Sequence, residues 1–433
     1  MSRLPTAIGR FRRPAQNPVP IYLLIEGGQA FLFALTFTLN LVYQATVAGL
    51  TPLEMVLIGT MLEATCFLFE IPTGIVADLY SRRRSILIGV AIIGIGFIVE
   101  GAIPAFVAIA LAQMIWGIGY TFTSGAVEAW ITDEIGEAEV GPVFLRGSQI
   151  SLIGGIAGTL LGTGLGLIAL QLPIVLGGVG MIALAIVLFV VMPERHMTVT
   201  PAEERSTFGH MRHTFVEGVR LARRRPVVRT LIAISLIVGL ASEAFDRLNQ
   251  VSILDRFTFP HILGSDNPAM AFGLSSLIGT ALGLIAAELL RRHRPESLDA
   301  GAPARLLAGL AAVQVGATIG FVLMGNIWLA FAMLWLRGVA GTLTSPISAA
   351  WMNRNLDSSL RATVISMEGQ ANAIGQVVGG PTLGWVGSRV SVSTAIIASG
   401  IVLSPVAGLY RSLRERPTRI EGTSPTLEVS PDA

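Results

Sequence analysis

Five ionisable side chains stand inside apolar stretches of this 433-residue sequence, where charged groups are costly and usually serve a function. At about 1.5 Å per helical residue, Glu26 lies about 9 Å inside one such stretch and Glu63 roughly 15 Å inside the next. Glu70 follows Glu63 by two helical turns, on the same face. Arg337 lies roughly 16 Å inside a later stretch, and Glu368 falls in the polar run "SMEGQANAIGQ". These positions predict a path for a small-molecule substrate or for protons.

A second group of charges belongs to the stretch "GIVADLYSRRRS", which closes an apolar run. Asp78 could face the positive N-terminal end of a helix that starts on the same side, and Gly74 would permit close helix contact there. Arg82 could reach an acid such as Glu128 or Asp133. This spacing predicts a latch that closes one end of the molecule.

A third group, Glu243, Asp246 and Arg247, clusters at the outer end of a later apolar run and is a candidate outer gate. Arg83 and Arg84 have a simpler interpretation as basic anchors at a membrane surface.

Four other side chains are predicted to be structural. Glu54 and Glu100 lie near the outer ends of apolar runs and are expected to be solvated. Trp130 and Trp351 are expected to anchor helix ends at the membrane interface, where amphipathic rings are enriched.

The elements that must position these groups follow from composition, since 52% of the residues are hydrophobic and only 13% are charged. Soluble domains carry about 25% charged residues, so the surface of this chain requires a bilayer. A crossing helix needs about 20 apolar residues. Twelve runs of that kind are present, at 20–48, 53–77, 85–103, 105–131, 148–169, 173–192, 227–248, 269–290, 303–324, 326–351, 363–386 and 390–411.

Arginine predicts the orientation of these spans, because cytoplasmic loops collect positive charge. All 30 basic residues are arginine. With twelve spans, 26 of them fall on one side, and only Arg247, Arg256 and Arg389 fall on the other. We therefore predict a multi-pass protein of the plasma membrane with both termini in the cytoplasm.

The chain divides at its hydrophilic stretches. An amphipathic basic helix is predicted between two six-span halves, from the spacing of Phe208, Met211, Phe215 and Val219. The predicted regions are an N-terminal segment at 1–19, a first half at 20–192, a linker at 193–226, a second half at 227–412 and a disordered tail at 413–433.

The two halves repeat each other. The stretch "GIGYTFTSGAVEAW" from Gly117 aligns without a gap with "GVAGTLTSPISAAW" from Gly338, in the fourth span of each half. In the following spans, "RGSQISLIG" from Arg146 resembles "RATVISMEG" from Arg361. Two matches in the same order indicate a parallel repeat, an arrangement in which transporters place the substrate site between the halves.

This repeat, together with Gly74, Asp78, Ser81 and Arg82 on the loop between the second and third spans, resembles the major facilitator superfamily. The resemblance implies an all-α fold of twelve transmembrane helices in two pseudo-symmetric halves. It also implies an alternating-access mechanism, with a cytoplasmic latch that favours the outward-open state. Two patterns of the drug/proton antiporters in this superfamily are kept only in part. Gly117 and Gly119 match their fourth span, but Gln113 replaces its arginine. The glycine spacing of their fifth span is kept, but Thr159 replaces its proline.

The resemblance favours a proton-coupled exporter of a drug-like or amphiphilic solute. A nutrient or lipid transporter on the same fold is the first alternative, and a membrane-embedded sensor or enzyme is the second. The sequence has no phosphate-binding loop, metal-ligand set or paired nucleophile and base. We therefore expect no metal, cofactor or nucleic-acid partner, and a monomer in the lipid bilayer.

Overall fold

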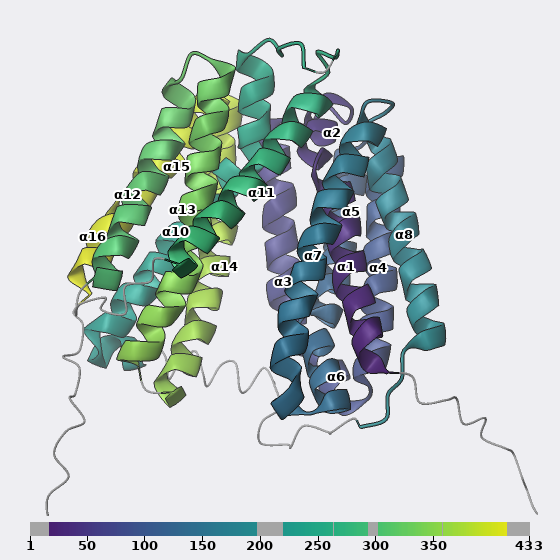
Figure 1. Ribbon diagram of the computed structural model, residues 1–433. Coiled ribbons are helices and arrows are strands. Elements are labelled where there is room, and N and C mark those ends of the chain that lie inside the picture. The colour runs from purple at the N-terminus through teal and green to yellow at the C-terminus, as the bar shows by residue number, and fades with distance from the viewer. Residues whose placement is uncertain (1–16, 197–219, 263, 293–301, 357, 414–433) are drawn as a thin grey trace, which may run out of the picture.

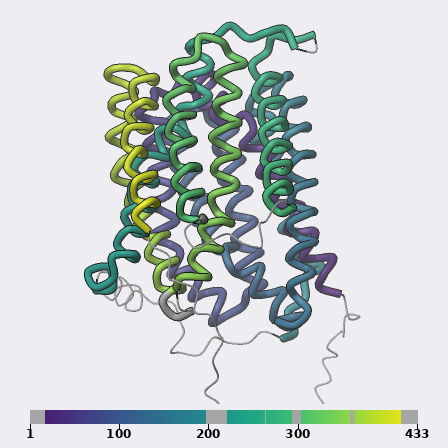
Figure 2. Tube along the Cα trace, turned by 60° about the vertical axis from the view of Figure 1, so that its left-hand side comes forward, coloured from purple at the N-terminus to yellow at the C-terminus, as the bar shows by residue number. Residues whose placement is uncertain are grey.

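Long helices run between two ends of the molecule in the computed structural model (Figure 1). The upper end carries the short helix α2 (Asn40–Thr46), and the lower end carries α6 (Ala126–Ile135). A second view shows the same long helices side by side (Figure 2). The structure describes residues 17–196, 220–262, 264–292, 302–356 and 358–413.

The other helices follow in chain order through the two halves. In the first half they are α1 (Pro18–Phe37), α3 (Pro52–Leu79), α4 (Arg82–Ala102), α5 (Phe106–Thr123), α7 (Glu137–Gly166) and α8 (Gln171–Val191). In the second half they are α10 (Pro226–Arg256), α11 (Pro268–Arg292), α12 (Ala302–Leu323), α13 (Ile327–Asn355), α14 (Ser358–Arg389), α15 (Val392–Leu403) and α16 (Pro405–Ser412).

The predicted all-α class is confirmed, because the described residues contain one isolated bridge, between Ile262 and Ser265, and no strand. Eleven helical segments among them are long and apolar enough to cross a membrane. The helix α14 is not one of the eleven, and its sequence includes Glu368 and three amide side chains. Its 32 residues are long enough to span a bilayer. The number of twelve spans therefore stays a prediction.

Local sequence explains where several helices begin. Thr51 and Glu54 form a capping box at the start of α3, so Glu54 stabilises a helix end rather than only meeting solvent. The Ser81 hydroxyl accepts a hydrogen bond from the backbone N–H of Arg84 at 2.9 Å and caps α4.

The fourth span of the first half is broken, although the sequence predicts one continuous run at 105–131. The chain turns between α5 and α6 at Gly125, whose φ of 70° favours glycine. The repeat places Pro346 at the equivalent position of the second half, where α13 continues as one helix. The repeated sequence thus has two different backbones at this point.

Glycine contacts hold the same helix pair together in each half. A Cβ added at Gly162 of α7 would come 2.9 Å from the carbonyl oxygen of Leu35 on α1. A Cβ added at Gly375 of α14 would come 2.8 Å from the backbone nitrogen of Leu240 on α10. The backbones of α1 and α7, and of α10 and α14, are therefore in direct contact, as small residues permit in membrane proteins.

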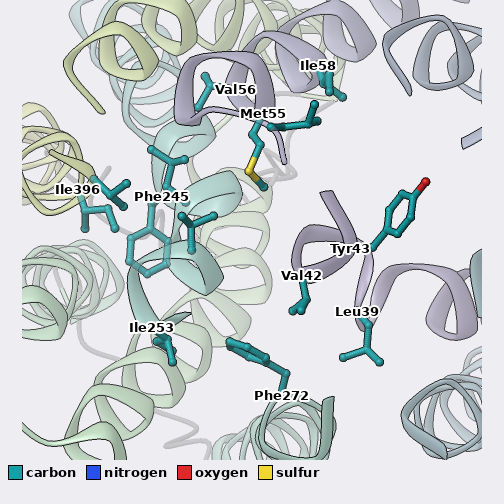
Figure 3. Close-up of a cluster of buried hydrophobic side chains, with 14 of the residues drawn as sticks. Leu39, Val42, Tyr43, Met55, Val56, Ile58, Phe245, Ile253, Phe272 and Ile396 are labelled. Carbon is teal, nitrogen blue, oxygen red and sulfur yellow. The ribbon is translucent and has the colours of Figure 1, made fainter. Parts of the chain in front are cut away.

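The two halves meet mainly through α3 with α14 and α7 with α11, and α10 also contacts α2 and α3. A Cβ added at Gly384 of α14 would come 2.9 Å from the Cβ of Val56 on α3. Buried apolar side chains from both halves join near these contacts (Figure 3). We call this cluster the upper seal; it includes Leu39, Val42, Tyr43, Met55, Val56, Phe245, Ile253 and Phe272.

Two other buried clusters each belong to one half alone. The helices that carry them diverge toward the lower end (Figure 1). The molecule is therefore joined at its upper end.

Most of the predicted amphipathic helix lies outside the described residues, including Phe208, Met211, Phe215 and Val219. The same holds for nearly all of the N-terminal segment and the tail, which stay predictions.

The glycine contacts make a direct prediction. Replacing Gly158 by Ala should destabilise the protein by about 1–3 kcal/mol, because overpacking forces neighbours apart. The new Cβ would lie 3.0 Å from the backbone nitrogen of Leu35 and still closer to the carbonyl oxygen of Phe31. Gly155→Ala is the matched control on the same helix, since its Cβ meets nothing within 4 Å. Thermal unfolding in detergent compares the stability of the two variants. Equal unfolding midpoints for Gly158→Ala and Gly155→Ala would contradict tight packing between α1 and α7.

Candidate functional site

A buried ion pair lies in the interface between the halves. The guanidinium Nε of Arg247 donates to the Glu243 carboxylate at 2.9 Å, and the two side chains are 14% and 6% exposed. Both residues are on α10, but they contact the other half. A Cβ added at Gly59 of α3 would come 2.5 Å from Arg247 Nε and 2.7 Å from Glu243 Cδ.

Glu63 lies one helical turn below this contact, on the same face of α3 as Gly59. It is half-buried and within electrostatic range of both Glu243 and Arg247. The structure thus gathers one predicted pathway residue, Glu63, and one predicted gate residue, Glu243, around the gate residue Arg247. Glu70, two turns further down, is exposed.

Arg337 and Asp246 form a second contact at this level. An Arg337 amino group lies 3.3 Å from the Asp246 carboxylate, and the guanidinium carbon lies 3.8 Å from the centre of the Phe245 ring. This is a cation–π arrangement. The sequence assigned Arg337 to the pathway and Asp246 to the gate, whereas the structure joins them. Phe245 belongs to the upper seal, so this contact ties α13 to it.

Glu26 lies elsewhere, at the α1–α7 contact, where the Ser151 hydroxyl donates to its carboxylate at 3.0 Å. The exposed Glu128 is within electrostatic range of Glu26. Glu368 lies apart from both groups and is half-buried on α14. Among the described residues, the five pathway candidates do not form one continuous chain of hydrogen bonds.

At the lower end, Arg82 binds the first half alone. It lies 2.5 Å from the Asp133 carboxylate of α6 and donates to the carbonyl oxygen of Ala129 at 2.6 Å. Within the described part of the chain, the Asp78 carboxylate makes no hydrogen bond or ion pair. A Cβ at Gly74 would meet nothing within 4 Å, so the close helix contact expected there is not present. The halves are joined at the opposite end, which explains why this part of the predicted latch has no partner.

Glu194, which the sequence did not single out, anchors the start of α4. Its carboxylate accepts from the Ser81 hydroxyl at 2.7 Å and from the backbone N–H of Arg83 at 3.0 Å. The Arg83 side chain donates to the carbonyl oxygen of Met192 at 2.8 Å. The interpretation of Arg83 as only a basic anchor at a membrane surface is therefore wrong, because its side chain also ties α4 to the end of α8. Arg84 is exposed.

The expectation that Glu100 is solvated is also wrong, because this side chain is completely buried. Its carboxylate accepts hydrogen bonds of 2.8 Å each from the amides of Asn40, Gln44 and Gln113, which come from α2 and α5. The hydroxyl of Tyr43 donates to the backbone oxygen of Glu100 at 2.7 Å. Charge-assisted hydrogen bonds of this kind replace the hydrogen bonds that an exposed carboxylate makes to water. Gln113, which stands where drug antiporters carry arginine, therefore completes a buried acid site.

Trp130 and Trp351 are core residues rather than interface anchors, since their exposures are 1% and 0%. The indole N–H of Trp130 donates to the carbonyl oxygen of Pro193 at 2.8 Å. The two tryptophans occupy equivalent positions of the repeat and are buried in equivalent clusters, one in each half.

The family follows from comparison with known proteins. The sequence profile of the Major Facilitator Superfamily matches residues 25–366, most of the chain. The chain belongs to the major facilitator superfamily. Membership in this superfamily favours membrane transport over the enzyme or sensor alternative.

Individual superfamily members are only distantly similar. The uncharacterized MFS-type transporter YxaM of Bacillus subtilis (strain 168) is 21% identical over 359 residues, covering 81% of this chain and 85% of its own. The crystal structure of the nucleoside transporter NupG superposes with a TM-score of 0.74 at 14% identity, covering 91% of this chain and 98% of NupG. A bacterial homologue of the lysosomal transporter Spinster, inward-facing and occupied, has a TM-score of 0.67 at 15% identity over 91% of this chain and 97% of its own. These structures share the fold.

The Glu100 site makes a testable prediction about stability. Glu100→Ala should lower the free energy of unfolding by about 1–3 kcal/mol, because it leaves buried amide donors unpaired. Glu139→Ala on α7 is the control, since that acid is exposed. Thermal unfolding of the purified protein compares them. An unchanged midpoint for Glu100→Ala would show that the amides find other partners.

Proposed function

We propose that this protein is a proton-coupled exporter of a drug-like or amphiphilic solute that works by alternating access. The arginine-rich side of the predicted spans corresponds to the lower end of the molecule in Figure 1. We therefore assign the lower end of the molecule, and both chain termini, to the cytoplasm. The state described above is then closed toward the outside and is the state in which an exporter takes up its solute. In this proposal residues 20–192 and 227–412 move as the two halves, joined by the linker at 193–226.

The observation that carries this proposal is the Glu243–Arg247 pair inside the upper seal, with Glu63 of the other half nearby. An ionised Glu63 is repelled by Glu243 and attracted by Arg247 across the interface. Protonation of Glu63 removes both interactions, and both depend on the contact between the halves. The proton therefore changes the relative free energies of the two states, as coupling requires.

Export is the direction favoured by the similarity of the first half to drug antiporters. Uptake of a nutrient or lipid on the same fold is the alternative. Structures of a nucleoside transporter and of a peptide-binding transporter of the POT family share the fold at 14% identity. Transport of a fluorescent amphiphile into inverted vesicles, against uptake into intact cells, distinguishes the two directions.

The coupling mechanism predicts a separation of flux from binding. Glu63→Gln and Glu26→Gln should reduce pH-gradient-driven flux more than solute affinity, because the amide cannot release a proton. Arg337→Ala should damage both, since it removes the contact of α13 with Asp246 and with the Phe245 ring of the upper seal. Vesicle flux and equilibrium binding of the same amphiphile measure the two effects. Full proton-driven flux in the Glu26→Gln, Glu63→Gln double variant would exclude these two acids as proton carriers.

The latch predicts a second set of effects. We propose that Asp78 engages the N-terminal end of α14 when the lower ends close, while Arg82 holds Asp133. Asp78→Asn and Arg82→Ala should therefore reduce transport about fivefold or more without unfolding the protein, since couplings of this kind are worth about 1–3 kcal/mol.

Arg84→Ala is the control for the latch, because that side chain is exposed on the same loop. Flux in vesicles and elution as a single folded species are measured for each variant. Equal damage from Arg84→Ala and Asp78→Asn would mean that the loop acts only through its total positive charge.

A further inference from the structure

A cavity of about 450 Å³ lies inside the second half, between α10, α12, α13, α14 and α16. Pockets of about 300–1,000 Å³ hold drug-sized ligands. Apolar side chains form much of the wall, and polar groups converge on it from four helices. These include Ser235, Gln314, Thr344, Ser348, Glu368 and Asn372.

Among the described residues that line this wall, Glu368 is the one acid and none is basic. Tyr410 is the other ionisable group that lines it. Among the described residues, the Glu368 carboxylate has no hydrogen bond or ion pair. A half-buried carboxylate without a counter-charge is costly, so this cavity is suited to receive a positive charge.

The neighbouring amides do not serve as donors to Glu368, because they are bonded elsewhere. Gln314 donates to the Thr344 hydroxyl at 3.2 Å, and Asn372 donates to the backbone oxygen of Ser235 at 3.3 Å. This differs from Glu100, whose carboxylate is bonded by three amides. The carboxylates of Glu100 and Glu368 thus have opposite environments, because the first is hydrogen-bonded by the protein and the second is not.

The repeat shows that helix packing does not require an acid here. Glu368 aligns with Ile153 of the first half, an exposed side chain on α7. The next residue is glycine in both halves, Gly154 and Gly369. The same helix position is therefore apolar in one half and acidic at the edge of a cavity in the other, which indicates a ligand-binding role rather than a packing role.

We propose that this cavity binds the solute through a protonated amine, with the ammonium group at Glu368 and the apolar body against the walls from α10, α13 and α16. This deepens the proposed transport function by naming the class of solute, an organic monocation. The serine and threonine hydroxyls supply acceptors for the remaining N–H groups.

The test uses the purified full chain in lipid nanodiscs and two probes of equal size, a phenylalkylamine and the matching phenylalkyl alcohol. At pH 7 the amine should bind about tenfold tighter than the alcohol, as a charge-assisted hydrogen bond predicts. Glu368→Gln should remove this preference, and Glu368→Asp should keep part of it. Glu288→Gln, an exposed acid of the same half, should leave the preference unchanged.

A further variant locates the site. Ser348→Leu should weaken the binding of both probes by filling the cavity. Retained alcohol binding or an unchanged unfolding midpoint shows that Glu368→Gln is folded. Equal affinity of the unmodified protein for the two probes, no binding of either, or a preference that survives Glu368→Gln in the folded protein overturns the proposal. The proposal is also overturned if the preference for the amine is lost in Glu63→Gln but kept in Glu368→Gln.

Flux separates this inference from the proposed function. Gradient-driven flux of an amphiphile without any preference for the amine refutes the inference and leaves the transport proposal intact. Tight, Glu368-dependent amine binding without flux across vesicles refutes the export proposal and leaves the amine site intact.

Discussion

A charge inside the hydrocarbon region has to find its partner within the protein, since neither water nor lipid supplies one. This constraint explains most of the polar structure of this chain. Glu100 is surrounded by amides, and Glu243 holds Arg247 one turn away on its own helix. Arg337 combines a carboxylate with an aromatic ring. Each arrangement places a side chain from one helix against a neighbouring helix, so neutralising the charge also fixes the packing.

The same constraint separates charges that hold the fold from charges that can change partner. The carboxylate of Glu100 is hydrogen-bonded within its own half, so these bonds do not depend on the contact between the halves. Arg247 lies at the boundary, where an acid of each half is within electrostatic range. Glu368 has no protein partner in the described chain. The groups that we assign to gating and binding are therefore those whose neutralisation depends on the conformation or on a ligand.

The sequence predicts much of the fold because hydropathy, arginine placement and the repeat are local or periodic signals. The helical spans and the Arg82–Asp133 contact could be anticipated for this reason. The Glu100 site could not, because its donors come from separate helices and no spacing marks them. Nor could the break at Gly125, since the aligned Pro346 lies in an unbroken helix. The pairing of Arg337 with Asp246 depends on how α10 and α13 pack, which depth estimates along single helices do not contain.

Two of the contacts between the halves, α3 with α14 and α7 with α11, are counterparts of each other under the repeat, since each joins the second span of one half to the fifth span of the other. A hinge formed by one contact alone would let one edge of the interface part while the other stayed in place. Here the pseudo-twofold arrangement places one of these contacts at each edge, so a tilt of one half against the other strains both. Parting of the upper end is then a single cooperative event. An intermediate in which only one edge of the interface has opened would let ions leak across the membrane. This geometry disfavours that intermediate, whatever solute the protein carries.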